Sequence, residues 1–159
     1  MRSRVRDKSE QPGARREELP RLLVPFTAGT LDPAVLDTAI RIAQVENAVL
    51  VPAYLLVVPL EFAPEAPLQS QVGVAMPLLE AVELAASRAG VPVDARIERG
   101  RTPIHALQKL WEVEQFERII VPAPIPGHPG FSPKDLAWML THAPSETLIL
   151  RPSPGSRAA

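Results

Sequence analysis

The sequence predicts an α/β domain built on a five-stranded, mainly parallel sheet with helices on both faces, a Rossmann-like arrangement. Short apolar runs typical of buried strands alternate with longer segments whose apolar residues recur at helical spacing. Three of those segments open with a capping residue followed by proline, the favoured start of a helix. Strands and helices that alternate in this way form right-handed crossovers between parallel strands. The three openings are Asp32-Pro33, Thr102-Pro103 and Ser132-Pro133.

The first two strands flank the first helix. Residues 22–24 form a continuous apolar run, residues 27–31 are a predicted turn, and the helix runs from Asp32 to about residue 47. The second strand is expected over residues 48–58. Because proline has no N–H to donate to a central ladder, Pro52 predicts a bulge, a bend or an early strand end there.

A proline-rich loop is expected next, over residues 60–71, followed by a helix that opens at Met76-Pro77. Gly90 ends this helix, since glycine is common just past a helix C-terminus. Alternating apolar residues predict the third strand at 93–97, and Gly100 is expected to turn the chain. The remaining predicted elements are a helix at 102–114, a strand at 118–121, a loop at 122–131, a helix from 132 and a strand, Thr147-Leu148-Ile149-Leu150, at 147–150.

The chain divides into a disordered basic arm (1–20), one folded domain (21–152) and a flexible tail (153–159). The arm carries many arginines and almost no apolar residues, so it cannot bury a core. It lacks the apolar core of a secretory signal. Binding of nucleic acid or an anionic surface by the arm stays open as an alternative, although nucleic acid is not the expected partner, because a mixed charge run is usually solvated.

Composition excludes several classes of function. The 159 residues include no cysteine, which removes disulfides, thiolate metal sites and a cysteine nucleophile. His105, His128 and His142 show no paired ligand spacing, so no metal site is expected, and no catalytic residue is identified. The longest apolar run, 48–60, is shorter than the ~20 residues of a membrane-spanning helix, so no integral membrane contact is expected. We expect a cytoplasmic protein.

The order and spacing of several short motifs resemble those of bacterial universal stress proteins over residues 22–152. This resemblance implies the universal stress protein fold and a role in stress response or regulation. The motifs are Leu22-Leu23-Val24-Pro25, the helix with Ala39 and Ala43, Leu84-Ala85 to Ala89-Gly90-Val91, Ile119-Ile120-Val121, and His142-Ala143-Pro144 before Leu148-Ile149-Leu150-Arg151-Pro152.

The resemblance also implies a test for nucleotide binding. Family members that hold ATP carry an acidic residue after the first strand and the pattern G-x2-G, with Gly and Ser or Thr nine residues later. Glycines let the backbone approach phosphates, and the hydroxyl residue adds donors at a helix start. In this sequence Thr27 stands where the acidic residue is expected, so the motif is degenerate at its first position.

The phosphate loop matches in two registers. Gly127-His128-Pro129-Gly130 satisfies G-x2-G, but counting on reaches Leu140-Thr141 and leaves no room for the next helix. Counting back from His142 places Pro133-Lys134 at the Gly-Ser/Thr pair, which respects the helix start. In this preferred register every phosphate-loop glycine is replaced, several by proline, which lacks an N–H.

A vestigial nucleotide site is thus expected at Thr27, Gly127, His128, Gly130, Ser132 and Lys134. The competing interpretation is structural: Asp135, three residues after Ser132, suits a capping box that satisfies the helix donors internally.

The leading functional hypothesis is a non-catalytic stress-response or regulatory module that needs no cofactor and acts through protein contacts. The alternative is an ATP-binding switch or weak ATPase with a rearranged phosphate loop. The apolar final strand, at a sheet edge, invites pairing. Since universal stress proteins commonly dimerise through this strand, we expect a homodimer through 147–150 and a further, unknown protein partner.

Overall fold

The structure is a computed structural model that describes residues 18–27, 31–124 and 130–153. Most of the predicted arm and tail, and also Gly127 and His128, lie outside the described residues. The elements in chain order are β1 (Arg21–Phe26), α1 (Pro33–Glu46), β2 (Val49–Val57), α2 (Gln69–Arg88), β3 (Arg96–Gly100), α3 (Pro103–Val113), β4 (Arg118–Pro122), α4 (Pro133–His142) and β5 (Glu146–Leu150).

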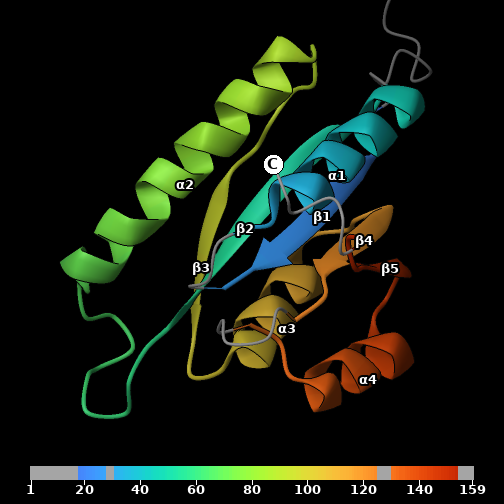
Figure 1. Ribbon diagram of the computed structural model, residues 1–159. Coiled ribbons are helices and arrows are strands. Elements are labelled where there is room, and N and C mark those ends of the chain that lie inside the picture. Colours follow the sequence, from blue (N-terminus) through green and yellow to red (C-terminus); the bar gives the residue numbers. More distant parts are fainter. Residues whose placement is uncertain (1–17, 28–30, 125–129, 154–159) are drawn as a thin grey trace, which may run out of the picture.

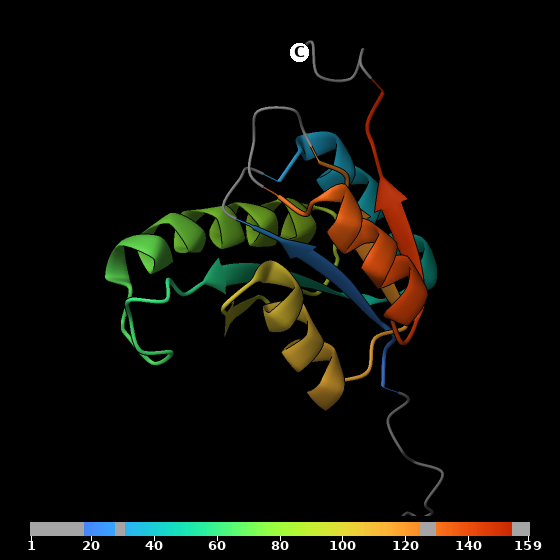
Figure 2. The same ribbon diagram turned by 90° about the horizontal axis from the view of Figure 1, so that it is seen from below.

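The strands form one sheet in the order β3-β2-β1-β4-β5, and every neighbouring pair is parallel. Helices α1 and α2 cover one face of the sheet, and α3 and α4 cover the other (Figures 1 and 2). This architecture confirms the predicted fold class.

Alternate side chains of the central strands pack into the core on the two faces of the sheet. Leu23, Val51 and Ile119 pack with residues of α3 and α4, whereas Leu22 and Leu50 pack with residues of α1 and α2. A strand buried on both faces has to be apolar throughout, which explains the unbroken apolar runs in the sequence.

The helix starts predicted at Asp32-Pro33 and Thr102-Pro103 are confirmed. Asp32 accepts a hydrogen bond from the Ala34 N–H at 2.8 Å, and Thr102 accepts one from the His105 N–H at 3.1 Å. In each case proline occupies the first turn, where its missing N–H costs nothing. These caps fix the two helices at the boundaries that the sequence predicts.

Strand β2 continues through Pro52, and its pairing register with β3 is the same on both sides of the proline. The N–H of Leu50 donates to the Pro92 carbonyl, so alternate residues of β2, including Pro52, face β3. The bridge between Leu50 and Val93 and the ladder that begins at Ala53 and Arg96 share one register, and pairing is interrupted only between them. The missing donor of Pro52 thus costs one step of the ladder.

Helix α2 begins at Gln69, not at Met76, so the predicted start was wrong by about two turns and Pro77 lies inside the helix. Val72, Ala75 and Leu79 pack against a cluster that includes Phe26 and Tyr54. Packing of this continuous apolar stripe outweighs the hydrogen bond and the steric fit that a proline loses inside a helix. Part of the predicted proline-rich loop is therefore helical.

Strand β3 lies three residues later than predicted, and Gly100 is its last residue instead of a turn. A Cβ on Gly100 would lie 2.6 Å from the Ala106 nitrogen of α3. Glycine is therefore required here by the close approach of strand and helix, and not by a turn. Within the described residues, no helix is long and apolar enough to cross a membrane.

Candidate functional site

The crevice at the carboxyl ends of β1 and β4 is the place where a ligand is expected in this topology. The chain leaves β1 toward β2 and β3 on one side, whereas β4 and β5 follow on the other, so strand order reverses here. The ladder between β1 and β4 is short, pairing Leu22 with Arg118 and Leu23 with Ile119. Pro25 faces β4, since the Arg21 carbonyl does, and its missing N–H fits the point where this ladder ends.

Two of the predicted site residues meet across this crevice. Thr27 follows β1 and is half-buried, and Gly130 lies on the segment that leads into α4. A Cβ on Gly130 would lie 4.0 Å from the Thr27 Oγ1. The residues Gly127 and His128, which complete the G-x2-G match, are outside the described part of the chain, so the first register has no described geometry.

The start of α4 is closed by its own side chains. Ser132 Oγ accepts from the Asp135 N–H at 3.1 Å, and Asp135 Oδ2 accepts from the Ser132 N–H at 3.1 Å. This reciprocal pair is the predicted capping box. Pro133 has no N–H, so Lys134 supplies the remaining backbone donor before Asp135. The Asp135 carboxylate adds negative charge where a phosphate would need positive charge.

Two arginines outside the predicted site, Arg99 and Arg101, hold the loop between β2 and α2. Arg101 donates to the carbonyls of Pro59 at 2.6 Å and Phe62 at 2.9 Å. Arg99 donates to the carbonyls of Ala66 and Pro67. The loop therefore has a fixed position beside the crevice edge of the sheet (Figure 1). The sequence offers no local signal for this, because the partners are backbone atoms more than thirty residues away.

At the opposite, amino-terminal edge of the sheet, four charged residues form a closed ion network. Asp94 pairs with Arg21 at 2.6 Å and with Arg96 at 3.0 Å, and Glu114 pairs with the same two arginines at 3.3 and 2.5 Å. The hydrogen bond from Arg96, with that from Arg21, lowers the pKa of Asp94 to about 2. The network ties β1, the approach to β3 and the end of α3 together.

Three rings stack between α3 and α4. Trp111 lies 5.7 Å from Trp138, and Trp138 lies 4.7 Å from His142, with nearly parallel planes. The His142 ring nitrogen Nδ1 is 3.0 Å from the Trp138 carbonyl. His142 therefore has a structural role at the end of α4. No cluster of three or more metal-ligating side chains occurs among the described residues.

No family model matches the sequence, and no curated protein is significantly similar to it. Solved structures are similar in fold. They include universal stress protein UspA from Lactobacillus plantarum (18% identity, 84% of this chain and 99% of that one, TM-score 0.64). A universal stress protein in complex with cAMP has 21% identity, with coverage of 85% and 99% and a TM-score of 0.63.

A third similar structure is a universal stress protein family protein from Arabidopsis thaliana with AMP bound (15% identity, coverage of 86% and 94%, TM-score 0.60). These likenesses define the class of protein: an α/β domain with the universal stress protein fold, as the sequence resemblance implied.

Proposed function

We propose that this chain is a universal-stress-protein-like regulatory module of the kind that does not bind ATP in the family manner. It is non-catalytic, acts in the cytoplasm and works through protein contacts, first of all with a second copy of itself. The observation that carries the proposal is the capping box at the start of α4.

The start of α4 is where the family resemblance puts the phosphate groups of a bound nucleotide. A phosphate site there needs free backbone N–H groups and no opposing charge. In this chain Ser132 and Asp135 bond to each other's N–H, and Pro133 contributes none. Thr27 replaces the acidic residue that would hold the sugar or base. Binding of a triphosphate would require the capping box to open.

The two edges of the sheet support pairing through β5. The β3 edge carries Arg96, Glu98 and Arg99, and charged residues protect an edge strand from pairing. In β5, Glu146 is followed by Thr147 and then by apolar residues up to Leu150. An edge of this kind suits a second copy in a symmetric dimer.

The second candidate function is a nucleotide-dependent switch or weak ATPase with a rearranged phosphate loop. Two observations favour it: the proximity of Thr27 and Gly130, and the AMP and cAMP complexes among structures of the same fold. A monophosphate is repelled less at the start of α4 than a triphosphate, because it places less negative charge beside Asp135.

Thermal unfolding with and without millimolar ATP and magnesium distinguishes the two functions. The same scan with AMP and cAMP, together with mass analysis of any co-purifying nucleotide, covers the monophosphates. A ligand at a hundred times its dissociation constant stabilises by roughly 2.7 kcal/mol, a shift of several degrees in a domain of this size. We expect no shift with ATP, and a clear shift would establish the nucleotide switch in place of our proposal.

A further inference from the structure

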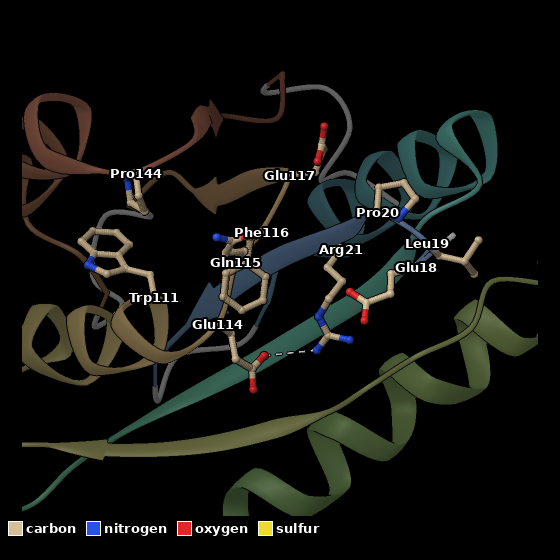
Figure 3. A pocket seen from close by; sticks show the side chains of 10 residues that line it. All are labelled: Glu18, Leu19, Pro20, Arg21, Trp111, Glu114, Gln115, Phe116, Glu117 and Pro144. Carbon is tan, nitrogen blue, oxygen red and sulfur yellow. Dashed lines mark hydrogen bonds and ion pairs between the residues drawn. The ribbon is translucent and has the colours of Figure 1, made fainter. Parts of the chain in front are cut away.

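A cavity of ≈ 430 Å³ opens at the amino-terminal edge of the sheet, on the opposite side from the crevice. It lies beside the ion network, where β1 begins and where the chain passes from α3 to β4. Figure 3 shows Trp111 and Pro144 at one side of this cavity and Glu18 and Leu19 at the other. Its lining residues are Glu18, Leu19, Pro20, Arg21, Trp111, Glu114, Gln115, Phe116, Glu117 and Pro144.

The chemistry of this pocket suits a guanidinium or ammonium group. Three carboxylates line it against one arginine, and Arg21 and Arg96 already neutralise Glu114. Among the residues that the structure describes, the exposed Glu18 and Glu117 have no ion-pair partner. Arg21 lies 5.9 Å from the centre of the Phe116 ring, a cation–π contact inside the pocket. Trp111 offers a second ring, and tryptophan is the strongest partner for such contacts.

The segment with the matching charge directly precedes a pocket residue in the chain. Residues 1–17 contain six of the chain's 17 basic residues and three of its 18 acidic residues, a net charge of +3. Residues 18–159 therefore carry a net charge of −4. Residue 18, the first that the structure describes, is itself part of the lining.

The short chain distance between the arginines and the pocket favours segment 1–17 over a separate ligand. The most distant arginine, Arg2, is sixteen residues from Glu18. For the disordered arm that the sequence predicts, this spacing corresponds to an average separation of roughly 20 Å. A tether of this length gives an effective concentration in the millimolar range, so contacts too weak for a free ligand are sufficient.

We propose that this acidic, aromatic pocket is a binding site for guanidinium groups and that its occupant is the arginine-rich segment 1–17 of the same chain. The arginines pair with Glu18 and Glu117 and lie against Trp111. When docked, the segment is withdrawn from anionic partners. Salt weakens docking, because the carboxylates are exposed.

The absence of cysteine makes a direct test possible in the full chain. A single Ser9→Cys variant carries one nitroxide label, which quenches tryptophan fluorescence at short range. Trp111 lines the pocket and stacks on Trp138, and these are the two tryptophans of the chain. We expect quenched emission at low salt and its recovery near 1 M salt, where the screening length falls to about 3 Å. The unlabelled chain at each salt concentration is the reference.

Charge variants test the assigned carboxylates. Glu18→Gln with Glu117→Gln, added to the labelled chain, should weaken docking roughly 1.5- to 5-fold for each pair lost and raise the emission. Glu80→Gln with Glu83→Gln makes the same charge change on the exposed side of α2 and should leave the quenching unaltered. Equal quenching in the two double variants would overturn the site.

The same labelled chain distinguishes the two sources of the segment. Quenching that is unchanged on dilution and on addition of excess unlabelled chain supports docking within one chain. Emission that recovers when unlabelled chain is added would show that the segment binds a second copy, and the assignment to the same chain would then be wrong.

Discussion

Gly100 is the residue whose size the fold constrains most directly. The Cβ of an alanine would lie 2.6 Å from the Ala106 nitrogen and 2.9 Å from its Cα, and neither backbone atom can rotate away. We expect Gly100→Ala to lower the free energy of unfolding by about 1 to 3 kcal/mol through overpacking between β3 and α3, measured by chemical denaturation.

Gly73 provides the matched control for Gly100. It lies exposed in α2, and a Cβ there would meet nothing within 4 Å. Gly73→Ala should therefore stabilise the protein by up to about 1 kcal/mol, since alanine favours a helix. A Gly100→Ala variant as stable as Gly73→Ala would contradict the close approach of β3 and α3.

Asp94 makes the free energy of unfolding depend on pH in the acidic range. The arginine contacts hold its pKa at about 2, below the ordinary value of 3.8. Its stabilising charge is therefore present above about pH 4 and is lost as the pH falls from about 4 to about 2. With a side chain 36% exposed, we expect a contribution of about 1 kcal/mol after solvent screening.

Asp94→Asn should therefore be less stable than the parent protein at neutral pH and should lose less stability between pH 4 and pH 2. Urea denaturation at a series of pH values measures both effects. Asp37→Asn is the matched control, because it removes the same charge from the exposed surface of α1. Identical pH profiles for the two variants would rule out a special role for the network.

At the scale of elements, α2 shows how far sequence patterns reach. The stripe of Val72, Ala75, Leu79 and Val82 is continuous in the sequence, so the full helix was readable from periodicity. Pro77 by itself favours a helix start, and the packing of Ala75 and Leu79 beside Phe26 and Tyr54 shows that the helix continues through it. The caps at Asp32, Thr102 and Ser132 depend on neighbours within three residues, and for that reason they were predicted correctly.

The long-range contacts of the site, unlike the helix caps, could be predicted from the sequence only in part. The crevice could be placed from the alternation of strands and helices, because topology alone determines it. The loop contacts of Arg99 and Arg101 and the Asp94 network join residues far apart in sequence, and a single sequence has no signal for such pairs. The close approach behind Gly100 was likewise hidden, and a turn was the natural local interpretation.

Pro77 is a defect that α2 tolerates, and its removal is testable. Alanine would restore an N–H that can donate to the Gly73 carbonyl four residues earlier and would remove the ring clash. We expect Pro77→Ala to raise the free energy of unfolding by about 1 to 3 kcal/mol in thermal or chemical denaturation. Pro64→Ala, in the exposed loop before α2, should instead be neutral or slightly destabilising, because it only frees the unfolded chain.

At the scale of the whole molecule, β5 is the edge strand through which we propose that the chain pairs with a second copy. Ala123 donates to the Leu150 carbonyl, so Leu150 and Leu148 face β4, whereas Thr147 and Ile149 face away from the sheet. Those outward N–H groups are the donors that a second copy would use.

Thr147→Pro removes one of these N–H groups without touching the β4 ladder, and an edge strand tolerates proline. We expect light scattering at micromolar concentration to report a dimer for the parent chain and a monomer for Thr147→Pro. Thr147→Val, which loses the same hydroxyl contact to the Ser145 carbonyl but keeps the N–H, should remain dimeric. A monomeric parent chain, or a dimeric Thr147→Pro variant, would exclude pairing through β5 and shift the search for partners to other surfaces of the domain.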